Sequence, residues 1–143
     1  MSYLDTSYLV RLYQDEPGAE TVRDLCSRHI VASSVHAKAE LPAALHRSLC
    51  EGRTRPDGFL SLIAQFQTDS AGGGFQWLPL SDSLLDGMAA RFASLPSTAF
   101  LRAADALHLA CAAAHGFTEI HSNDPHLLAA APLFGLQGVN VIA

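Results

Sequence analysis

Residues 3–13 read YLDTSYLVRLY, and Asp5 is the only acidic residue among them. The apolar pattern predicts a buried strand that ends at Asp5 and continues into a helix. In a parallel α/β sheet, ligands gather at the carboxyl ends of the strands. Asp5 is therefore a candidate for chemistry, although an aspartate in this position can equally well cap the helix that follows.

Four further apolar runs have the character of short strands, and each is separated from the next by room for at least one helix. This order predicts an α/β layer architecture with a mainly parallel sheet. A flexible connection, Gly72–Gly74, precedes the third strand but is too short to divide the chain. The strands are expected at 2–5 (SYLD), 29–33 (HIVAS), 75–80 (FQWLPL), 118–122 (TEIHS) and 139–142 (VNVI).

Local signals predict where several helices begin and end. Pro17 suits the first turn of one helix. Ser81 and Asp82 precede the helical pattern of residues 83–95, and Gly116 is a stop for the pattern of residues 106–115. Residues 33–52 read as one long helix, in which Pro42 should cause a kink or a break beside Glu40.

The composition favours one compact domain over residues 1–143. Of these residues, 49% are hydrophobic and 16% are charged, which argues against disorder. The net charge of −5 counts against a nucleic-acid partner. That argument weakens if several of the acidic residues hold a metal ion.

Cysteine usage and the apolar end of the chain favour a cytoplasmic protein with no membrane span. The three cysteines show no CxxC spacing and are expected to be reduced thiols. Asp5 occupies a position where a signal peptide requires basic and then apolar residues. Residues 125–143 lack Asp, Glu, Lys and Arg, but their prolines and glycines indicate buried soluble structure.

Asp105 is the most informative carboxylate. The sequence around it, AADALHLACAAAHGFT (103–118), has no other charged residue and predicts a helix buried on all sides. Burial of an unpaired carboxylate is costly. A metal ion or an ion pair with Arg102 could compensate it, while the helix dipole alone would contribute only about 0.3–1 kcal/mol.

Two further acids follow predicted strands. Asp124, with Pro125 after it, suits a helix N-cap that could still present one oxygen to a site. Glu40 lies on a helix whose periodicity also allows a solvated glutamate. If Asp5, Glu40, Asp105 and Asp124 converge, their mutual repulsion requires a cation, and oxygen ligands without thiolates favour Mg²⁺ or Mn²⁺.

Four segments together resemble a PIN-domain ribonuclease, specifically the VapC-type toxin of bacterial toxin–antitoxin pairs. The resemblance runs almost end to end. It departs from the family at Pro42, directly after the helix glutamate, and at Ser122, where the family more often has threonine. The segments are YLDTSYLVRLYQDE (3–16), HAKAELPAALHR (36–47), LRAADALHLACAAAHG (101–116) and IHSNDPHLLAAA (120–131).

The resemblance implies a three-layer α/β/α sandwich and an acidic site that binds one or two Mg²⁺ or Mn²⁺ ions and hydrolyses an RNA phosphodiester. It also implies a cognate VapB-like antitoxin and a homodimer. Ser7 and Ser122 would support the acids, and the cationic residues Arg47, Arg53 and Arg55 would guide RNA phosphates. The acids of the implied site are Asp5, Glu40, Asp105 and Asp124.

Other classes of protein fit less well. A receiver domain needs a late lysine, and the only lysine is Lys38. An aspartyl-phosphate phosphatase typically needs a second aspartate at position 7, which is Ser7. His108, Cys111 and His115 share a helix face, but in a histidine-rich chain this spacing more often reflects packing than zinc. A catalytically inactive PIN-fold module that binds RNA or protein is the remaining alternative.

Overall fold

The computed structural model describes residues 1–142 and contains five short strands, all parallel. Three of them form one sheet in the order β1-β2-β3, and β4 pairs with β5. A parallel bridge between Leu4 and His121 joins β1 to β4, so the strand order is β3-β2-β1-β4-β5. The strands are β1 (Ser2–Tyr3), β2 (Val31–Ser34), β3 (Gln76–Leu78), β4 (Glu119–His121) and β5 (Gln137–Val139).

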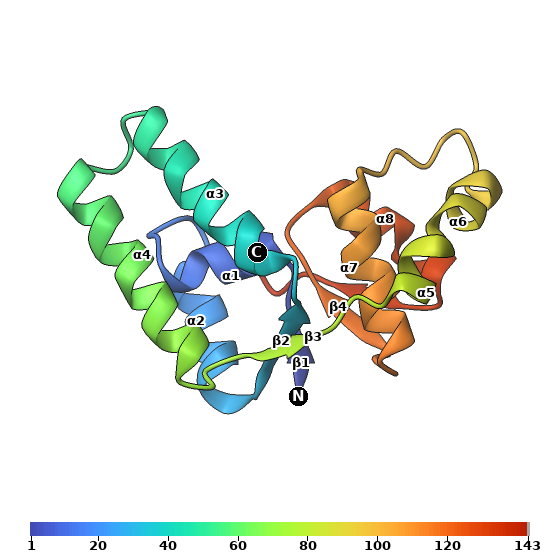
Figure 1. The fold of residues 1–143 in the computed structure, drawn as a ribbon, viewed down its shortest axis with the longest axis horizontal. Helices are drawn as coiled ribbons and strands as arrows, with labels where there is room; N and C mark the ends of the chain where they lie inside the picture. The colour runs from blue at the N-terminus through green and yellow to red at the C-terminus, as the bar shows by residue number, and fades with distance from the viewer. Residues whose placement is uncertain (143) are drawn as a thin grey trace.

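Helices cover both faces of these strands (Figure 1). The hairpin of α3 (Ala37–Cys50) and α4 (Pro56–Ala71) lies on one side with α1 and α2, while α5 to α8 lie on the other side. The remaining elements are α1 (Thr6–Leu9), η1 (Val10–Leu12), α2 (Ala19–Arg28), α5 (Asp82–Asp86), α6 (Met88–Ser94), α7 (Ala103–Ala114), α8 (Pro125–Ala130) and η2 (Ala131–Phe134).

Consecutive residues of the first strand segment belong to two different hydrophobic cores, because side chains alternate between the faces of a strand. Tyr3 packs in a core with residues of α7, β4 and α8. Leu4 packs in a second core with residues of α1, α2, α3 and α4. Two cores on opposite faces of one sheet define three layers, which confirms the predicted α/β/α sandwich.

Leu109 on α7 is fully buried in the first core. We expect Leu109→Ala to lower the free energy of unfolding by about 2–5 kcal/mol, because it leaves a cavity in a packed interior. Leu60→Ala, on the exposed side of α4, is the matched control and should change stability by less than about 0.5 kcal/mol. Urea denaturation followed by circular dichroism measures both values, and equal stability of the two variants would contradict the layer assignment.

Four of the predicted strands lie where expected within a few residues, but the last was placed too late. The prediction was 139–142, whereas β5 is Gln137–Val139. A Cβ atom at Gly138 would lie 2.9 Å from Leu128 Cδ2, so glycine allows the strand to approach α8 closely. Beyond β5 the chain turns towards Tyr8, whose hydroxyl donates to Asn140 Oδ1 (2.8 Å) and accepts from the Val141 amide (2.7 Å).

Some helix limits also differ from the prediction. Pro17 precedes α2 rather than entering its first turn, because Gly18 adopts a left-handed conformation (φ 85°) and places the helix start at Ala19. Gly87 separates α5 from α6, where one helix was expected. The N-cap at Ser81 and the stop at Gly116 (φ 80°) are confirmed.

Pro42 does not break its helix, since α3 runs continuously from Ala37 to Cys50. The long helix predicted over 33–52 is shorter at its start, because residues 31–34 form β2. Residues 125–142 fold into α8, η2 and β5, and no helix among the described residues has the length and hydropathy needed to span a membrane.

Candidate functional site

Asp5 lies at the junction of β1 and α1 and combines both roles that its position allows. Its carboxylate accepts a hydrogen bond from the Tyr8 amide (3.1 Å), so it caps α1. Its backbone amide donates to the carbonyl of His121 at the end of β4 (3.0 Å). The residue is only 3% exposed. Its carboxyl group is therefore buried at the carboxyl ends of β1 and β4.

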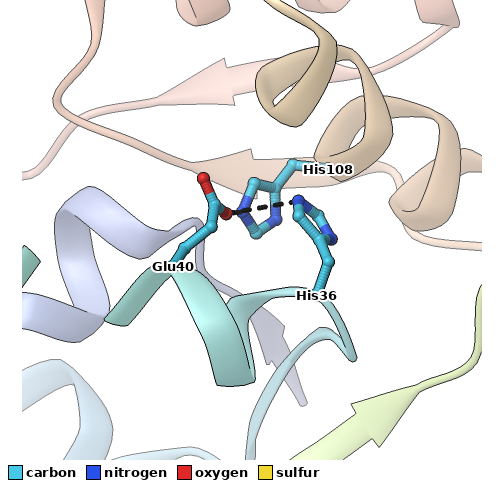
Figure 2. Close-up of side chains that lie close together, drawn as sticks. All are labelled: His36, Glu40 and His108. Atoms are coloured by element: carbon cyan, nitrogen blue, oxygen red, sulfur yellow. Dashed lines mark hydrogen bonds and ion pairs between the residues drawn. The ribbon is translucent and has the colours of Figure 1, made fainter. Parts of the chain in front are cut away.

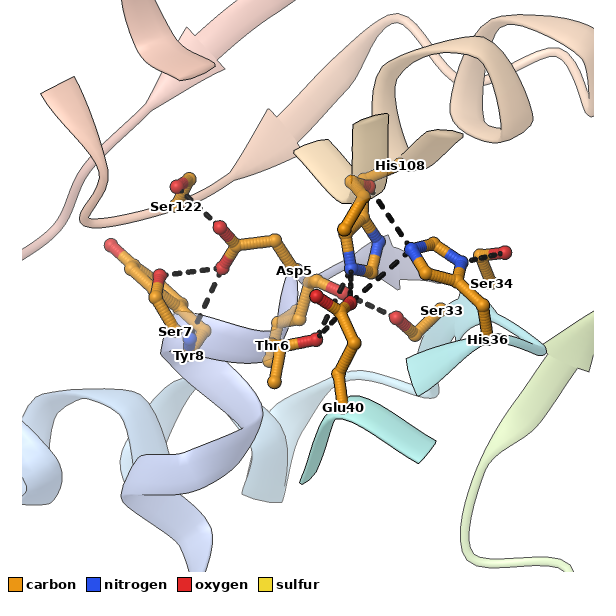
Figure 3. A network of polar contacts seen from close by, with 12 residues as sticks. Asp5, Thr6, Ser7, Tyr8, Ser33, Ser34, His36, Glu40, His108 and Ser122 are labelled. Carbon is orange, nitrogen blue, oxygen red and sulfur yellow. Dashed lines mark hydrogen bonds and ion pairs between the residues drawn. The ribbon is translucent and has the colours of Figure 1, made fainter. Parts of the chain in front are cut away.

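Two serine hydroxyls hold the Asp5 carboxylate in place (Figure 3). Ser7 Oγ donates to Oδ1 (2.6 Å) and Ser122 Oγ donates to Oδ2 (2.5 Å). The same hydroxyls accept the amides of Asn123 and Asp124, both at 2.9 Å. Each serine therefore connects the start of the chain to the loop that follows β4.

Burial raises the pKa of the Asp5 carboxyl above its ordinary value of 3.8, although His108 and the two serine hydroxyls oppose the shift. A nearby cation would remove much of this cost. Asp124 lies beside this group as the N-cap of α8, where its Oδ1 accepts the amides of His126 (2.8 Å) and Leu127 (3.3 Å). Pro125 at the first helical position completes the predicted cap.

Asp105 stands in the first turn of α7 and is partly buried. Within residues 1–142 no ion pair joins it to Arg102, which is exposed. Burial raises the pKa of Asp105, and the negative charges of Asp124, Asp5 and Glu40 raise it further. Asp105 is therefore within electrostatic range of the other three predicted acids, and only His108 opposes their effect on its pKa.

The helix that carries Asp105 is less enclosed than predicted. Ala106 and residues 108–112 of α7 are buried, but Ala103 and Ala114 at its two ends are exposed. Asp105 is itself partly exposed, so a ligand can reach its carboxylate from solvent.

Glu40 differs from the other acids because one of its oxygens faces two histidine side chains (Figure 2). Its Oε1 atom lies 2.7 Å from His108 Nε2 and 3.2 Å from His36 Nε2. Thr6 Oγ1 donates to the same oxygen at 2.8 Å. Burial alone would raise the pKa of Glu40, but the bonds from His108, His36 and Thr6 outweigh it and hold the pKa well below 4.5.

The partners of the two histidines determine which ring nitrogen carries the proton. Tyr3 Oη accepts the Ser34 amide (3.1 Å), so its own proton is directed to His108 Nδ1 (2.7 Å) and His108 donates from Nε2. His36 Nε2 lies 3.0 Å from the Ala104 carbonyl, which can only accept. His36 therefore also donates from Nε2, while its Nδ1 accepts from Ser34 Oγ (2.7 Å).

The predicted cationic residues lie away from the acids. Arg47 is seven residues beyond Glu40 on α3, a distance of about 10 Å along the helix. Its Nε atom pairs with Glu51 Oε1 (2.9 Å), and Arg53 pairs with the other oxygen of the same carboxylate (2.9 Å). Arg55 faces Asp57 at 3.9 Å. All three arginines are exposed at the far end of the α3–α4 hairpin.

The four acids have the oxygen donors that a hard divalent ion prefers. Within residues 1–142 they do not bring three ligand atoms within 4.8 Å of one another, whereas His36, Glu40 and His108 do. Mg²⁺ keeps several of its waters and is usually bound through only one or two carboxylates, so a loose ring of acids suits it. The repulsion of Asp105 by the other three acids is the observation that favours a cation there.

The zinc arrangement considered on α7 does not form. His108 faces Tyr3 and Glu40, while Cys111 Sγ points to the Leu78 carbonyl (3.9 Å). His115 Nε2 lies 3.1 Å from the Pro79 carbonyl. These three side chains take part in packing and local hydrogen bonding, which is what their spacing in a histidine-rich chain more often reflects.

With this geometry in place, comparison with known proteins shows the family. The PIN domain model matches residues 2–132, and the chain therefore belongs to the PIN domain family. No curated protein sequence matches it.

Solved structures agree with the fold. VapC20 of Mycobacterium tuberculosis, a toxin that cleaves the sarcin–ricin loop, superposes with a TM-score of 0.70 at 16% identity over 91% of this chain and 95% of that one. VapBC2 of Rickettsia felis, bound to a promoter DNA fragment, gives 0.66 at 16% identity over 98% of each chain. FitAB bound to an IR36 DNA fragment gives 0.68 at 18% identity over 98% and 94%.

Sequence reasoning missed the side chains that surround Glu40. His36 precedes it by four residues and so shares its helix face, a signal that was available. His108 follows Asp105 by three residues on α7, and the spacing alone gave no reason to connect it with Glu40. Thr6 follows Asp5 directly and was not considered separately, although a hydroxyl beside an acid at the end of a strand can donate a hydrogen bond to the site.

Proposed function

We propose that this protein is a metal-dependent endoribonuclease, the toxin of a toxin–antitoxin pair. The observation that carries the proposal is the placement of Asp105 near the other three acids, which raise its pKa. Asp5 and Asp124 stand at the ends of β1 and β4. Glu40 and Asp105 lie in the first turns of α3 and α7. Membership of the PIN domain family supports it. The similar fold of the sarcin–ricin-loop-cleaving toxin VapC20 supports RNA as the substrate.

Asp5, Asp105 and Asp124 would hold Mg²⁺ or Mn²⁺, with Glu40 at the edge of the site. Such an ion supplies a water of lowered pKa and stabilises charge on a phosphoryl oxygen. The chain's own residues prepare the site. Ser7 and Ser122 fix both oxygens of Asp5, so that its orientation is set before any ligand arrives.

Glu40 is kept ionised by the histidines and by Thr6. A carboxylate with this pKa remains charged throughout the neutral range and attracts cations and their bound waters to its side of the site. Its second oxygen is free of these contacts, because all three side chains face Oε1. With a metal held by the three aspartates, Glu40 would be suited to bind the waters of that ion.

Partners and location follow from the same proposal. The fold similarity to VapBC2 and to FitAB supports a cognate antitoxin that covers the site. The proposed toxin is a homodimer and acts in the cytoplasm. Arg47, Arg53 and Arg55 would contact RNA phosphates outside the acidic site, and their carboxylate partners predict weak, salt-sensitive binding.

The test is cleavage of a labelled total-RNA pool by the purified protein. We expect discrete fragments with Mg²⁺ or Mn²⁺ and none with EDTA. Asp5→Asn should reduce cleavage at least about 100-fold, because it weakens the fixed carboxylate of the site. Asp86→Asn, at the exposed end of α5, is the matched control and should cleave normally.

The control also identifies contaminating nucleases, which would act equally in every preparation. Fragments that persist in EDTA or in Asp5→Asn would contradict the proposal. Absence of fragments from the folded wild-type protein, together with no Mn²⁺ binding by calorimetry, would instead favour an inactive module that binds RNA or protein.

A further inference from the structure

We propose that His36, Glu40 and His108 form a binding site for Zn²⁺ or a similar borderline divalent ion, which shares only Glu40 with the hard-ion site of the acids. The three donors are two imidazole nitrogens and one carboxylate oxygen, which lie within 4.8 Å of one another (Figure 2). They come from the start of α3 and from α7, so the site exists only in the folded chain.

The spacing is close to what zinc requires. With metal–ligand bonds of about 2.0–2.2 Å in a tetrahedral site, neighbouring donors lie about 3.3–3.5 Å apart. Glu40 Oε1 is 3.2 Å from His36 Nε2 and 2.7 Å from His108 Nε2. An outward shift of less than about 1 Å by Glu40 would bring both of these distances into that range. The His36 and His108 rings, whose centroids are 4.2 Å apart, would also have to turn their Nε2 atoms towards the ion.

Each histidine already has the outer partner that a zinc ligand needs. A metal-bound imidazole usually donates its other N–H to an oxygen, which fixes the ring. His108 Nδ1 faces Tyr3 Oη at 2.7 Å, and His36 Nδ1 faces Ser34 Oγ at 2.7 Å. Both hydroxyl oxygens can accept as well as donate. A move of each ring proton from Nε2 to Nδ1 then frees both Nε2 atoms without changing the charge of either histidine.

The cost includes the hydrogen bonds that the Nε2 protons now make, and the hydroxyl protons of Tyr3 and Ser34 must also turn away from the two Nδ1 atoms. Glu40 Oε1 exchanges two N–H donors for the ion, which is a stronger electrostatic partner. The half-buried Ala104 carbonyl loses its 3.0 Å contact with His36. Thr6 Oγ1 lies 3.2 Å from His108 Nε2 and 2.8 Å from Glu40 Oε1, so a hydroxyl stands beside the open coordination position.

Donor chemistry separates this site from the acidic one. Imidazole suits Zn²⁺ and related ions, whereas carboxylate oxygens suit Mg²⁺ and Mn²⁺. Glu40 borders both sites, and Zn²⁺ would draw it towards the histidines. If the protein cleaves RNA as proposed above, Zn²⁺ should inhibit cleavage at saturating Mg²⁺; this consequence rests on the proposed function, whereas the binding of Zn²⁺ does not.

The test is calorimetric titration of the untagged full chain with Zn²⁺, together with Co²⁺ as a spectroscopic probe of coordination. We expect one Zn²⁺ per chain and Co²⁺ absorption typical of nitrogen and oxygen ligands. His36→Ala should weaken Zn²⁺ binding at least about 10-fold, the lower end of what even an outer partner contributes. His126→Ala, an exposed histidine outside the site, is the matched control.

Two further variants keep the result unambiguous. His108 is buried, so His108→Gln is used with a thermal melt that verifies folding, and it should weaken Zn²⁺ binding as His36→Ala does. Asp105→Asn should leave Zn²⁺ affinity within about 3-fold, because Asp105 is not among the three donors.

Equal Zn²⁺ affinity in wild type, His36→Ala and folded His108→Gln would overturn the site, as would no binding by wild type. Loss of Zn²⁺ binding in Asp105→Asn alone would assign the ion to the acids instead. Zn²⁺ binding that follows the histidines in a protein without RNA cleavage would uphold this site and overturn only the proposed function.

Discussion

Asp105→Asn should abolish RNA cleavage and at the same time make the protein more resistant to heat at neutral pH. The carboxylate is repelled by Asp124, Asp5 and Glu40, and no salt bridge among residues 1–142 includes it, although His108 offsets part of the repulsion. The amide removes the charge that the folded state tolerates poorly while keeping the size of the side chain. Cleavage should fall at least about 100-fold, because the site loses a group placed to stabilise a cation and the charge it carries.

The sign of the pH dependence follows from the direction of the shift. The pKa of Asp105 in the folded protein is raised above its ordinary value of 3.8. Ionisation therefore costs the folded state more than the unfolded state, and wild-type stability is lost as the pH rises from 3.8 through the raised value. The variant has no such loss, so the difference in melting temperature should be near zero in acid and largest at neutral pH.

Thermal melts between acid and neutral pH, with and without Mg²⁺, measure this effect. Mg²⁺ should narrow the difference at neutral pH, because an ion that binds the folded wild type stabilises it. Asp86→Asn, matched in chemistry but exposed, should melt like wild type at every pH. A variant that melts below wild type at neutral pH would show that Asp105 is compensated in the free protein.

Glu40→Gln should have the opposite effect on stability. This carboxylate receives hydrogen bonds from His108 and Thr6 and lies 3.2 Å from His36 Nε2, and its pKa lies below the ordinary value of 4.5. Because bonds to a charged acceptor are stronger than bonds to a neutral amide, the change should lower the free energy of unfolding by about 1–2 kcal/mol. Cleavage should also fall, since the charge beside the acidic site is gone.

The stability that Glu40 contributes depends on pH in the opposite direction to that of Asp105. A depressed pKa contributes stability that is present above 4.5 and is lost as the pH falls through the folded-state value. The difference in the free energy of unfolding between wild type and Glu40→Gln should therefore be largest at neutral pH and should disappear in acid. Urea denaturation at several pH values measures it, with Glu20→Gln on the exposed face of α2 as control. Stability equal to that of the control would mean that the histidines do not hold the carboxylate.

The sequence allowed the strand-end acids to be predicted, because their signals are local. Asp5 and Asp124 each follow an apolar strand and precede a helix start, and both act as N-caps. The choice between a metal ion and Arg102 as the partner of Asp105 could not be made from the sequence. It depends on the direction of an exposed N-cap side chain, which tertiary packing decides.

The surroundings of Glu40 were beyond local reasoning for a different reason. His108 is 68 residues away from Glu40, and only the packing of α7 over the start of α3 brings the two together. The last strand was misplaced because VNVI has the more apolar pattern, while the close approach of α8 favours the segment with Gly138. Long-range packing decided both cases.

The hydrogen bonds of Ser7 and Ser122 also have a consequence for the nascent chain during translation. Ser122 is separated from Asp5 by 117 positions, and Ser7 is separated from Asn123 by 116. Contacts of such long range form late, because the intervening chain must first be ordered. During synthesis, at about 5–20 residues per second, Asp5 and Ser7 are made long before their partners Ser122 and Asn123. A nascent chain on the ribosome therefore carries no assembled acidic cluster, and a ribonuclease built in this way would be harmless to the ribosome that is still translating it.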